Sequence, residues 1–256
     1  MARPRALLLV ATLLALASPA FAAIVPISDL HKNTSSVIPN RNGLWFDVSG
    51  IVTCPDSVYS KFNTQTFIQD YSGGLSLFQS GGIGAGLHFN LGDSVSVRGQ
   101  VTQFNGLTEL TNLTNLQVIS TGNFATDPLV LTCAQLNATL FVSTPDSFPE
   151  YNEGRLIRIN NVTKTSGTWP STCTGANSTL MITDGTATST LFIDLDSEVC
   201  GSPDPSGPFD VIGILSQFDS SAPYSTGYQI VPRYKSDIIP RTPGPVFLDG
   251  PTAVNV

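Results

Sequence analysis

Residues 95–104 read VSVRGQVTQF, and this stretch decides the fold because a related stretch occurs later in the chain. Apolar and polar side chains alternate along it, which is typical of a β-strand with one face in a hydrophobic core. Residues 209–218 read FDVIGILSQF, so the glycine and the closing Gln-Phe pair return 114 positions later. FIQD at 67–70 returns at the same offset as MITD at 181–184. A repeat of this length indicates a duplicated domain, because solenoid units recur about every 20 to 50 residues.

Short strands separated by turn residues fill both copies. Asp70 and Asp184 open equivalent tight turns that glycines follow, and we interpret both aspartates as turn residues rather than as a catalytic pair. The third connection is long in both copies, and the glycine-rich residues 81–86 predict a loop there. We expect strands near residues 44–53, 65–71, 74–79, 94–104 and 107–119, and again near 155–163, 178–184, 189–195, 208–218 and 227–232.

Five strands with a long connection after the third predict a five-stranded Greek-key barrel of the OB-fold type, present twice in an all-β chain. Residues 48–53, 67–78, 91–99 and 104–110 resemble the OB-fold domains of exported bacterial nucleases and surface proteins, the YhcR-like group. The second copy is more divergent. The resemblance implies an accessory binding domain, and its link to nucleic acid is inherited from the fold by analogy.

The first 22 residues are typical of an export signal. Arg3 and Arg5 precede an apolar run at 6–17, and small residues surround Phe21 at the expected cleavage site. A membrane anchor is the alternative, but a run of this length is shorter than the roughly 20 apolar residues that span a bilayer. We therefore expect a secreted or cell-surface protein with no membrane insertion after cleavage.

The remaining chain divides into three parts. We expect the first barrel at 23–126, the second at 127–240, and a Pro/Gly-rich tail or linker at 241–256. A short apolar segment precedes each barrel, at 27–30 and at 133–136, and each is expected to form one helical turn that closes a barrel end. The duplication also predicts that each half folds when expressed alone.

The charge of the chain argues against strong binding of nucleic acid. The chain has 12 Lys and Arg against 19 Asp and Glu, a net charge of −7. The acidic excess lies mainly in the second half, where residues 127–240 carry five basic and twelve acidic side chains. Because binding to phosphate backbones depends on Lys and Arg, the second barrel is expected to bind nucleic acid poorly.

Four cysteines in an exported chain favour disulfides over metal ligation. Three pairings are open, and we favour Cys173 with Cys200 and Cys54 with Cys133. A zinc site is the alternative, but the sequence has no Cys-x-x-Cys motif. We expect no metal and no cofactor.

No catalytic motif is recognisable in the sequence. His31 and His88 are isolated, and no nucleophile or phosphate-binding motif accompanies them. Asp194, Asp196 and Glu198 have the spacing that begins a calcium loop, but the glycine and the twelfth-position glutamate are missing, so a solvated acidic loop is the preferred interpretation. We interpret the source as bacterial and treat the N-glycosylation sequons as plain polar positions, at Asn33, Asn112, Asn137, Asn161 and Asn177.

Aromatic residues in the barrel loops are the candidate ligand-binding residues. OB-folds bind through their second and third strands and through the loops that join strands 1–2 and 4–5. Residues 219–226 lengthen the 4–5 loop of the second barrel by six residues. The alternative is that these aromatic rings pack against the barrel rims. The candidates in these loops are Tyr59, Phe62, Phe104, Asn105, Trp169 and Tyr224.

These observations predict a secreted, non-enzymatic tandem OB-fold module for binding or spacing. The alternative is a single-stranded nucleic-acid or polysaccharide-binding accessory region of an exported nuclease or other hydrolase. The partners that suit the sequence are a polysaccharide, a protein or, weakly, a single-stranded nucleic acid.

Export is expected to remove residues 1–22, so the secreted protein begins at Ala23. N-terminal sequencing of the secreted protein checks this expectation. Recovery of a chain that still begins at Met1 would contradict it.

Overall fold

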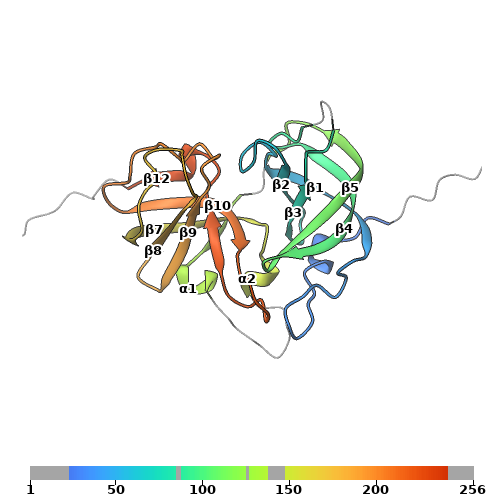
Figure 1. Cartoon of the computed structure of the whole chain (residues 1–256), viewed down its shortest axis with the longest axis horizontal. Coiled ribbons are helices and arrows are strands. Elements are labelled where there is room, and N and C mark those ends of the chain that lie inside the picture. The colour runs from blue at the N-terminus through green and yellow to red at the C-terminus, as the bar shows by residue number, and fades with distance from the viewer. Residues whose placement is uncertain (1–22, 85–87, 125–126, 138–147, 242–256) are drawn as a thin grey trace, which may run out of the picture.

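The computed structural model describes residues 23–84, 88–124, 127–137 and 148–241, which form two β-barrels lying side by side (Figure 1). The expected export signal at 1–22 and the tail beyond residue 241 lie outside the described residues. Within the described part of the chain, no helix combines the length and the apolar character needed to cross a membrane.

The first barrel is closed by five strands in the order β1-β2-β3-β5-β4. Strands β3 and β5 run parallel and the other neighbours antiparallel, which is the OB-fold arrangement. Burial alternates strictly along the first eight residues of β4, as residues 95–104 predict. The strands are β1 (Trp45–Cys54), β2 (Thr64–Gln69), β3 (Gly74–Gln79), β4 (Ser94–Phe104) and β5 (Leu107–Ser120).

The second barrel has the same order of strands. Its sheet runs β10-β11-β9-β8-β7, and an additional pairing of β10 with β7 joins the ends. Strands β9 and β11 are parallel, like β3 and β5. The predicted all-β, OB-fold class is confirmed. The strands are β7 (Leu156–Ser166), β8 (Ser178–Thr183), β9 (Thr188–Ile193), β10 (Phe209–Gln217) and β11 (Tyr228–Val231), with β6 (Leu129–Leu131) and β12 (Ile238–Pro240) at the sheet edges.

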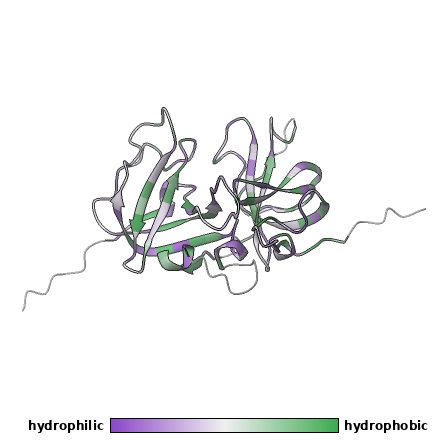
Figure 2. Cartoon of the chain, turned by 60° about the horizontal axis from the view of Figure 1, so that its bottom comes forward, coloured by the Kyte–Doolittle hydropathy of each residue, from purple (hydrophilic) through white to green (hydrophobic). Residues whose placement is uncertain are grey.

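Each barrel has its own hydrophobic core, and hydrophobic residues are concentrated on the strands (Figure 2). A short helical turn closes each barrel, namely the 3-10 turn Ile27–Asp29 (η1) and helix α1 (Cys133–Leu136). The equivalent aspartates hold these turns: a carboxylate oxygen of Asp70 accepts the Ile27 amide at 3.1 Å, and one of Asp184 accepts the Cys133 amide at 3.0 Å. Both aspartates also accept amides within their own turns, as their predicted role requires.

A third apolar cluster, the inter-barrel cluster, joins the two barrels. Leu156, Ile214 and Val231 of the second barrel pack against the first. Strand β10 is apolar on both faces because Val211 and Leu215 enter the barrel core while Ile214 enters this cluster. The residues from the first barrel are Cys54, Val58, Tyr59, Phe67 and Leu107.

Polar side chains are buried around this cluster and bridge the barrels. Helix α2 (Phe148–Tyr151) carries Glu150, whose carboxylate accepts a hydrogen bond from the Asn33 amide at 2.7 Å. Glu153 accepts the backbone amide of Thr108 at 2.9 Å. Burial, and then the neighbouring Glu150 carboxyl, raise the pKa of Glu153 well above its ordinary value. Arg233 pairs with Asp237 of its own barrel and also donates to the carbonyl of Thr53 on β1, so this buried guanidinium links the two barrels.

The cysteines differ in part from expectation. Cys173 and Cys200 form a disulfide with Cα atoms 5.6 Å apart, as predicted. The expected pairing of Cys54 with Cys133 is wrong, because both are free and buried. Cys54 lies in the inter-barrel cluster, whereas Cys133 lies in the core of the second barrel. Burial raises the pKa of both thiols.

Two glycine backbones, at Gly74 and Gly154, lie against each other where the barrels meet. A Cβ atom on Gly74 would lie 2.2 Å from the carbonyl carbon of Gly154, and one on Gly154 would lie 2.5 Å from the Leu75 amide nitrogen. Gly154 also has a φ of +75°, a conformation that L side chains rarely adopt. Both positions therefore require glycine.

Substitution Gly154→Ala is expected to destabilise the chain by about 3 kcal/mol or more, because it adds a steric overlap with β3 to the cost of positive φ. The matched control is Gly43→Ala, since Gly43 has a φ of +81° and a Cβ atom there would meet no other atom within 4 Å. The control substitution is expected to lower the free energy of unfolding by about 1 kcal/mol. Urea midpoints of the two variants check this, and equal losses would contradict the close approach.

Candidate functional site

The outer face of β2 and β3, through which OB-folds commonly bind ligands, is covered in the first barrel. Phe67 is 2% exposed and packs in the inter-barrel cluster. Gln69 is 6% exposed, and its side-chain oxygen accepts the Leu156 amide at 3.1 Å. The second barrel thus occupies the face where a ligand of the first barrel would be expected.

The equivalent face of the second barrel is open. Thr179 and Thr188 are exposed on β8 and β9, and Met181 and Thr190 between them are half-buried. Thr179 lies opposite Phe192 across the two strands, and Met181 lies opposite Thr190. This face presents mostly hydroxyl and methyl groups.

A cleft of about 250 Å³, the inter-barrel cleft, lies between the barrels. The β4–β5 turn and the β10–β11 loop meet beside it, where the Asp219 amide donates to the Asn105 carbonyl at 2.7 Å. Phe104 and Phe218 both line the cleft and remain 62% and 60% exposed. Phe192 and Gln229 line it as well, so the cleft adjoins the open face of the second barrel.

Amide side chains supply much of the polar lining. Gln65 of β2 and Gln229 of β11 line the cleft, and neither side chain makes a hydrogen bond within the described residues. Gln217 donates to the carbonyls of Tyr224 and Thr226 at 2.8 Å each, which holds the long β10–β11 loop in place. Asn177 is hydrogen-bonded to Asp194 at 3.1 Å. The side-chain amides of Gln65 and Gln229 are therefore available to a ligand.

Two acidic side chains, and no Lys or Arg, are among the described residues that line the cleft. Glu109 is 6% exposed, and the Ser76 hydroxyl donates to it at 3.2 Å. Burial raises the pKa of Glu109 to about 7. Burial also raises the pKa of Asp194. The cleft is thus acidic or neutral, depending on pH.

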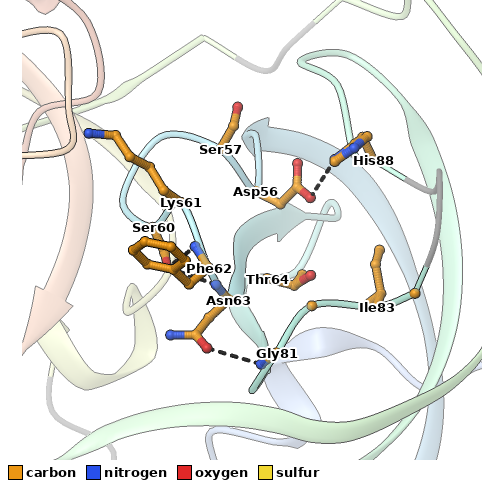
Figure 3. A pocket seen from close by; sticks show the side chains of 12 residues that line it. Asp56, Ser57, Ser60, Lys61, Phe62, Asn63, Thr64, Gly81, Ile83 and His88 are labelled. Carbon is orange, nitrogen blue, oxygen red and sulfur yellow. Dashed lines mark hydrogen bonds and ion pairs between the residues drawn. The ribbon is translucent and has the colours of Figure 1, made fainter.

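A second pocket of about 540 Å³ lies between the β1–β2 and β3–β4 loops of the first barrel (Figure 3). Phe62 is 84% exposed there. The pocket's charged groups already have partners: His88 Nδ1 lies 3.2 Å from an Asp56 carboxylate oxygen, and Lys61 pairs at 2.8 Å with Asp196 of the second barrel.

The structure separates the aromatic residues predicted to bind ligand. Phe104 and Tyr59 line the inter-barrel cleft, but Tyr59 is 7% exposed and its hydroxyl donates to the Val231 carbonyl at 2.7 Å. Phe62 belongs to the other pocket. Asn105 has a φ of +49° and contributes its carbonyl to the contact between the loops.

The two predicted residues of the second barrel lie elsewhere. Trp169 is 5% exposed in the core of the second barrel, edge-to-face with Phe209, and its indole N–H donates to the Ser202 carbonyl at 3.0 Å. Tyr224 is half-buried, and its backbone amide donates to the Ser36 carbonyl across the barrels.

Phe218, Glu109 and Gln229 were not among the predicted residues. Phe218 could have been found from the repeat, because it follows Gln217 as Phe104 follows Gln103. Glu109 pairs in register with Ser76, and Gln229 pairs with Thr190 at the equivalent place in the second barrel. The inserted residues of the β10–β11 loop hide this equivalence in the sequence.

The strand order defines a chain of two OB-fold barrels. No family model matches the chain. The chain is 23% identical over 206 residues to endonuclease YhcR of Bacillus subtilis (strain 168), a match that covers 79% of this chain and 16% of the endonuclease. The expected resemblance to the YhcR-like group is confirmed, and the chain spans about a sixth of that protein.

Similar solved structures include the second OB-fold domain of replication protein A from Methanococcus maripaludis, which is 18% identical with a TM-score of 0.25 and covers 32% of this chain and 91% of that one. A murine DNA-binding protein bound to double-stranded DNA is 8% identical with a TM-score of 0.36 and covers 76% of this chain and 99% of that one. The strand order of the two barrels carries the fold assignment.

The raised pKa of Glu109 predicts that stability falls as the pH rises. Its folded pKa of about 7 lies above its ordinary value of 4.5, so its contribution is complete below pH 4.5 and is lost as the pH passes through about 7. Between pH 4.5 and about 7, the free energy of unfolding of the unsubstituted chain is expected to fall by up to about 3 kcal/mol relative to that of Glu109→Gln. Urea midpoints measured across pH check this, with exposed Glu198→Gln as the control. Parallel profiles for the chain and Glu109→Gln would contradict it.

Proposed function

We propose that the chain is a secreted, non-enzymatic binding module of two OB-fold barrels and that its ligand lies in the inter-barrel cleft. The observation that carries the proposal is the pair of exposed rings, Phe104 and Phe218, which line one cleft while the usual ligand face of the first barrel is covered. Exposed aromatic rings with a few unpaired polar groups are typical of ligand sites.

Two features support secretion. The first 22 residues have the charge and hydropathy pattern of an export signal. The Cys173–Cys200 disulfide suits an oxidising compartment. The buried free thiols of Cys54 and Cys133 are compatible with such a compartment, because burial protects them from exchange.

The similarity to endonuclease YhcR favours a second candidate, in which these barrels are the accessory region of an exported nuclease or other hydrolase. In that role the module would hold single-stranded nucleic acid or polysaccharide near a catalytic domain. The charge of the cleft opposes the nucleic-acid form of this role, because Glu109 and Asp194 line it and Lys61 nearby is paired with Asp196.

Single-stranded DNA is therefore expected to bind weakly, with a Kd above about 10 µM at physiological salt, and the purified chain is expected not to cleave it. Stacking on Phe104 and Phe218 favours binding, but phosphate repulsion by the acidic lining outweighs it. Fluorescence anisotropy with an oligothymidylate checks the affinity, and gel electrophoresis after incubation with divalent cations checks for cleavage.

At about 500 mM salt, where phosphate repulsion is screened and residual binding by stacking is easiest to measure, Phe104→Ala is expected to weaken binding, whereas Phe124→Ala is not. Phe124 is 99% exposed and does not line the cleft, so it is a matched control. Sub-micromolar affinity with a steep salt dependence would contradict this expectation and favour nucleic acid as the ligand. Cleavage by the purified chain would show that it is an enzyme.

A further inference from the structure

We propose that the inter-barrel cleft binds a neutral oligosaccharide, an inference that rests on the proposed binding function and names its ligand class. Four features of the molecule support it: the exposed rings, the unpaired amides, the charge of the cleft and the neighbouring face of the second barrel.

The two exposed phenylalanines provide flat apolar surfaces on both sides of one interface. Phe104 ends β4 of the first barrel, and Phe218 follows β10 of the second, at equivalent positions of the repeat. Phe104 is 62% exposed and Phe218 is 60% exposed. A sugar ring offers a face of C–H groups that packs on an aromatic ring without needing a charge.

The unpaired amides match the chemistry of sugar hydroxyls. A hydroxyl both donates and accepts a hydrogen bond, and a glutamine amide carries both kinds of group at one end. Gln65 reaches the cleft from the first barrel and Gln229 from the second, and within the described residues both side chains lack a hydrogen-bond partner. Gln229 lines the cleft, so its amide is within reach of a ligand there.

The charge of the cleft discriminates against anionic ligands. Its charged lining residues are Glu109 and Asp194, whose carboxyl oxygens accept hydrogen bonds from hydroxyls but repel phosphate. The only hydrogen bond of the Glu109 carboxyl within the described residues comes from Ser76. The hydroxyls of a neutral sugar polymer can donate hydrogen bonds to these oxygens without electrostatic repulsion.

The open face of the second barrel gives a longer sugar chain a surface on which to continue. Phe192 and Gln229 line the cleft and also belong to that face, where Gln229 pairs with Thr190. Thr179 and Thr188 beyond them are exposed. Hydroxyl groups along this path suit a polymer of several sugar units better than a single sugar.

Isothermal titration of the secreted chain with neutral β-linked hexasaccharides of glucose, xylose and N-acetylglucosamine tests the proposal. At least one is expected to bind with a Kd of about 10 µM to 1 mM, unchanged between about 50 and 500 mM salt. Phe104→Ala and Phe218→Ala are each expected to weaken binding about tenfold, and Gln229→Ala about fivefold. Phe124→Ala is the control and is expected to bind normally. Thermal melts confirm that the variants fold.

The contrary outcomes are distinguishable. If no hexasaccharide binds but oligothymidylate binds and depends on Phe104 and Phe218, the sugar assignment is overturned while the binding function of the cleft stands. If a hexasaccharide binds equally well to both phenylalanine variants, the site is not the cleft and the proposal is overturned. If neither probe binds the intact chain, the sugar assignment and the proposed binding function both fall.

Discussion

The contact between two glycine backbones, Gly74 on β3 and Gly154 before β7, is the constraint on which the arrangement depends. It allows the second barrel to lie directly on the outer face of β2 and β3. Phe67 and Gln69 are buried by this contact, and Leu107 packs in the same apolar cluster. The position of the inter-barrel cleft follows from it, because the two strand-end loops meet only when the barrels are this close.

Charged groups at this interface are paired rather than excluded. Arg233 makes two hydrogen bonds with the Asp237 carboxylate, at 2.9 and 3.0 Å, and also reaches the Thr53 carbonyl of the first barrel. Loss of one partner in such a buried pair leaves an uncompensated charge, which costs more than the intact pair contributes. The polar network therefore specifies one relative orientation of the barrels, while the inter-barrel cluster supplies apolar burial.

The strands were predictable from sequence because each depends on local alternation and on turn residues such as Asp70 and Asp184. The inter-barrel packing was not, since an apolar side chain on a strand can face a core or a neighbouring domain. The apolar residues on either side of Gly213 do not by themselves show which of them faces the neighbouring barrel. The cysteine pairing failed for a similar reason, because sequence spacing does not place Cys54 and Cys133 in separate apolar clusters. Trp169 shows that a loop aromatic can equally well complete a core.

The two barrels pack through different faces, so the contact between them is head-to-tail. A head-to-tail contact can in principle continue to a third module, unlike a twofold contact that closes on itself. At the positions equivalent to Phe67, Gln69 and Gly74, the second barrel has Met181, Thr183 and Thr188. The Thr188 side chain stands where the close backbone approach requires glycine. The Thr188 side chain therefore opposes the stacking of a further barrel on the second one in this mode.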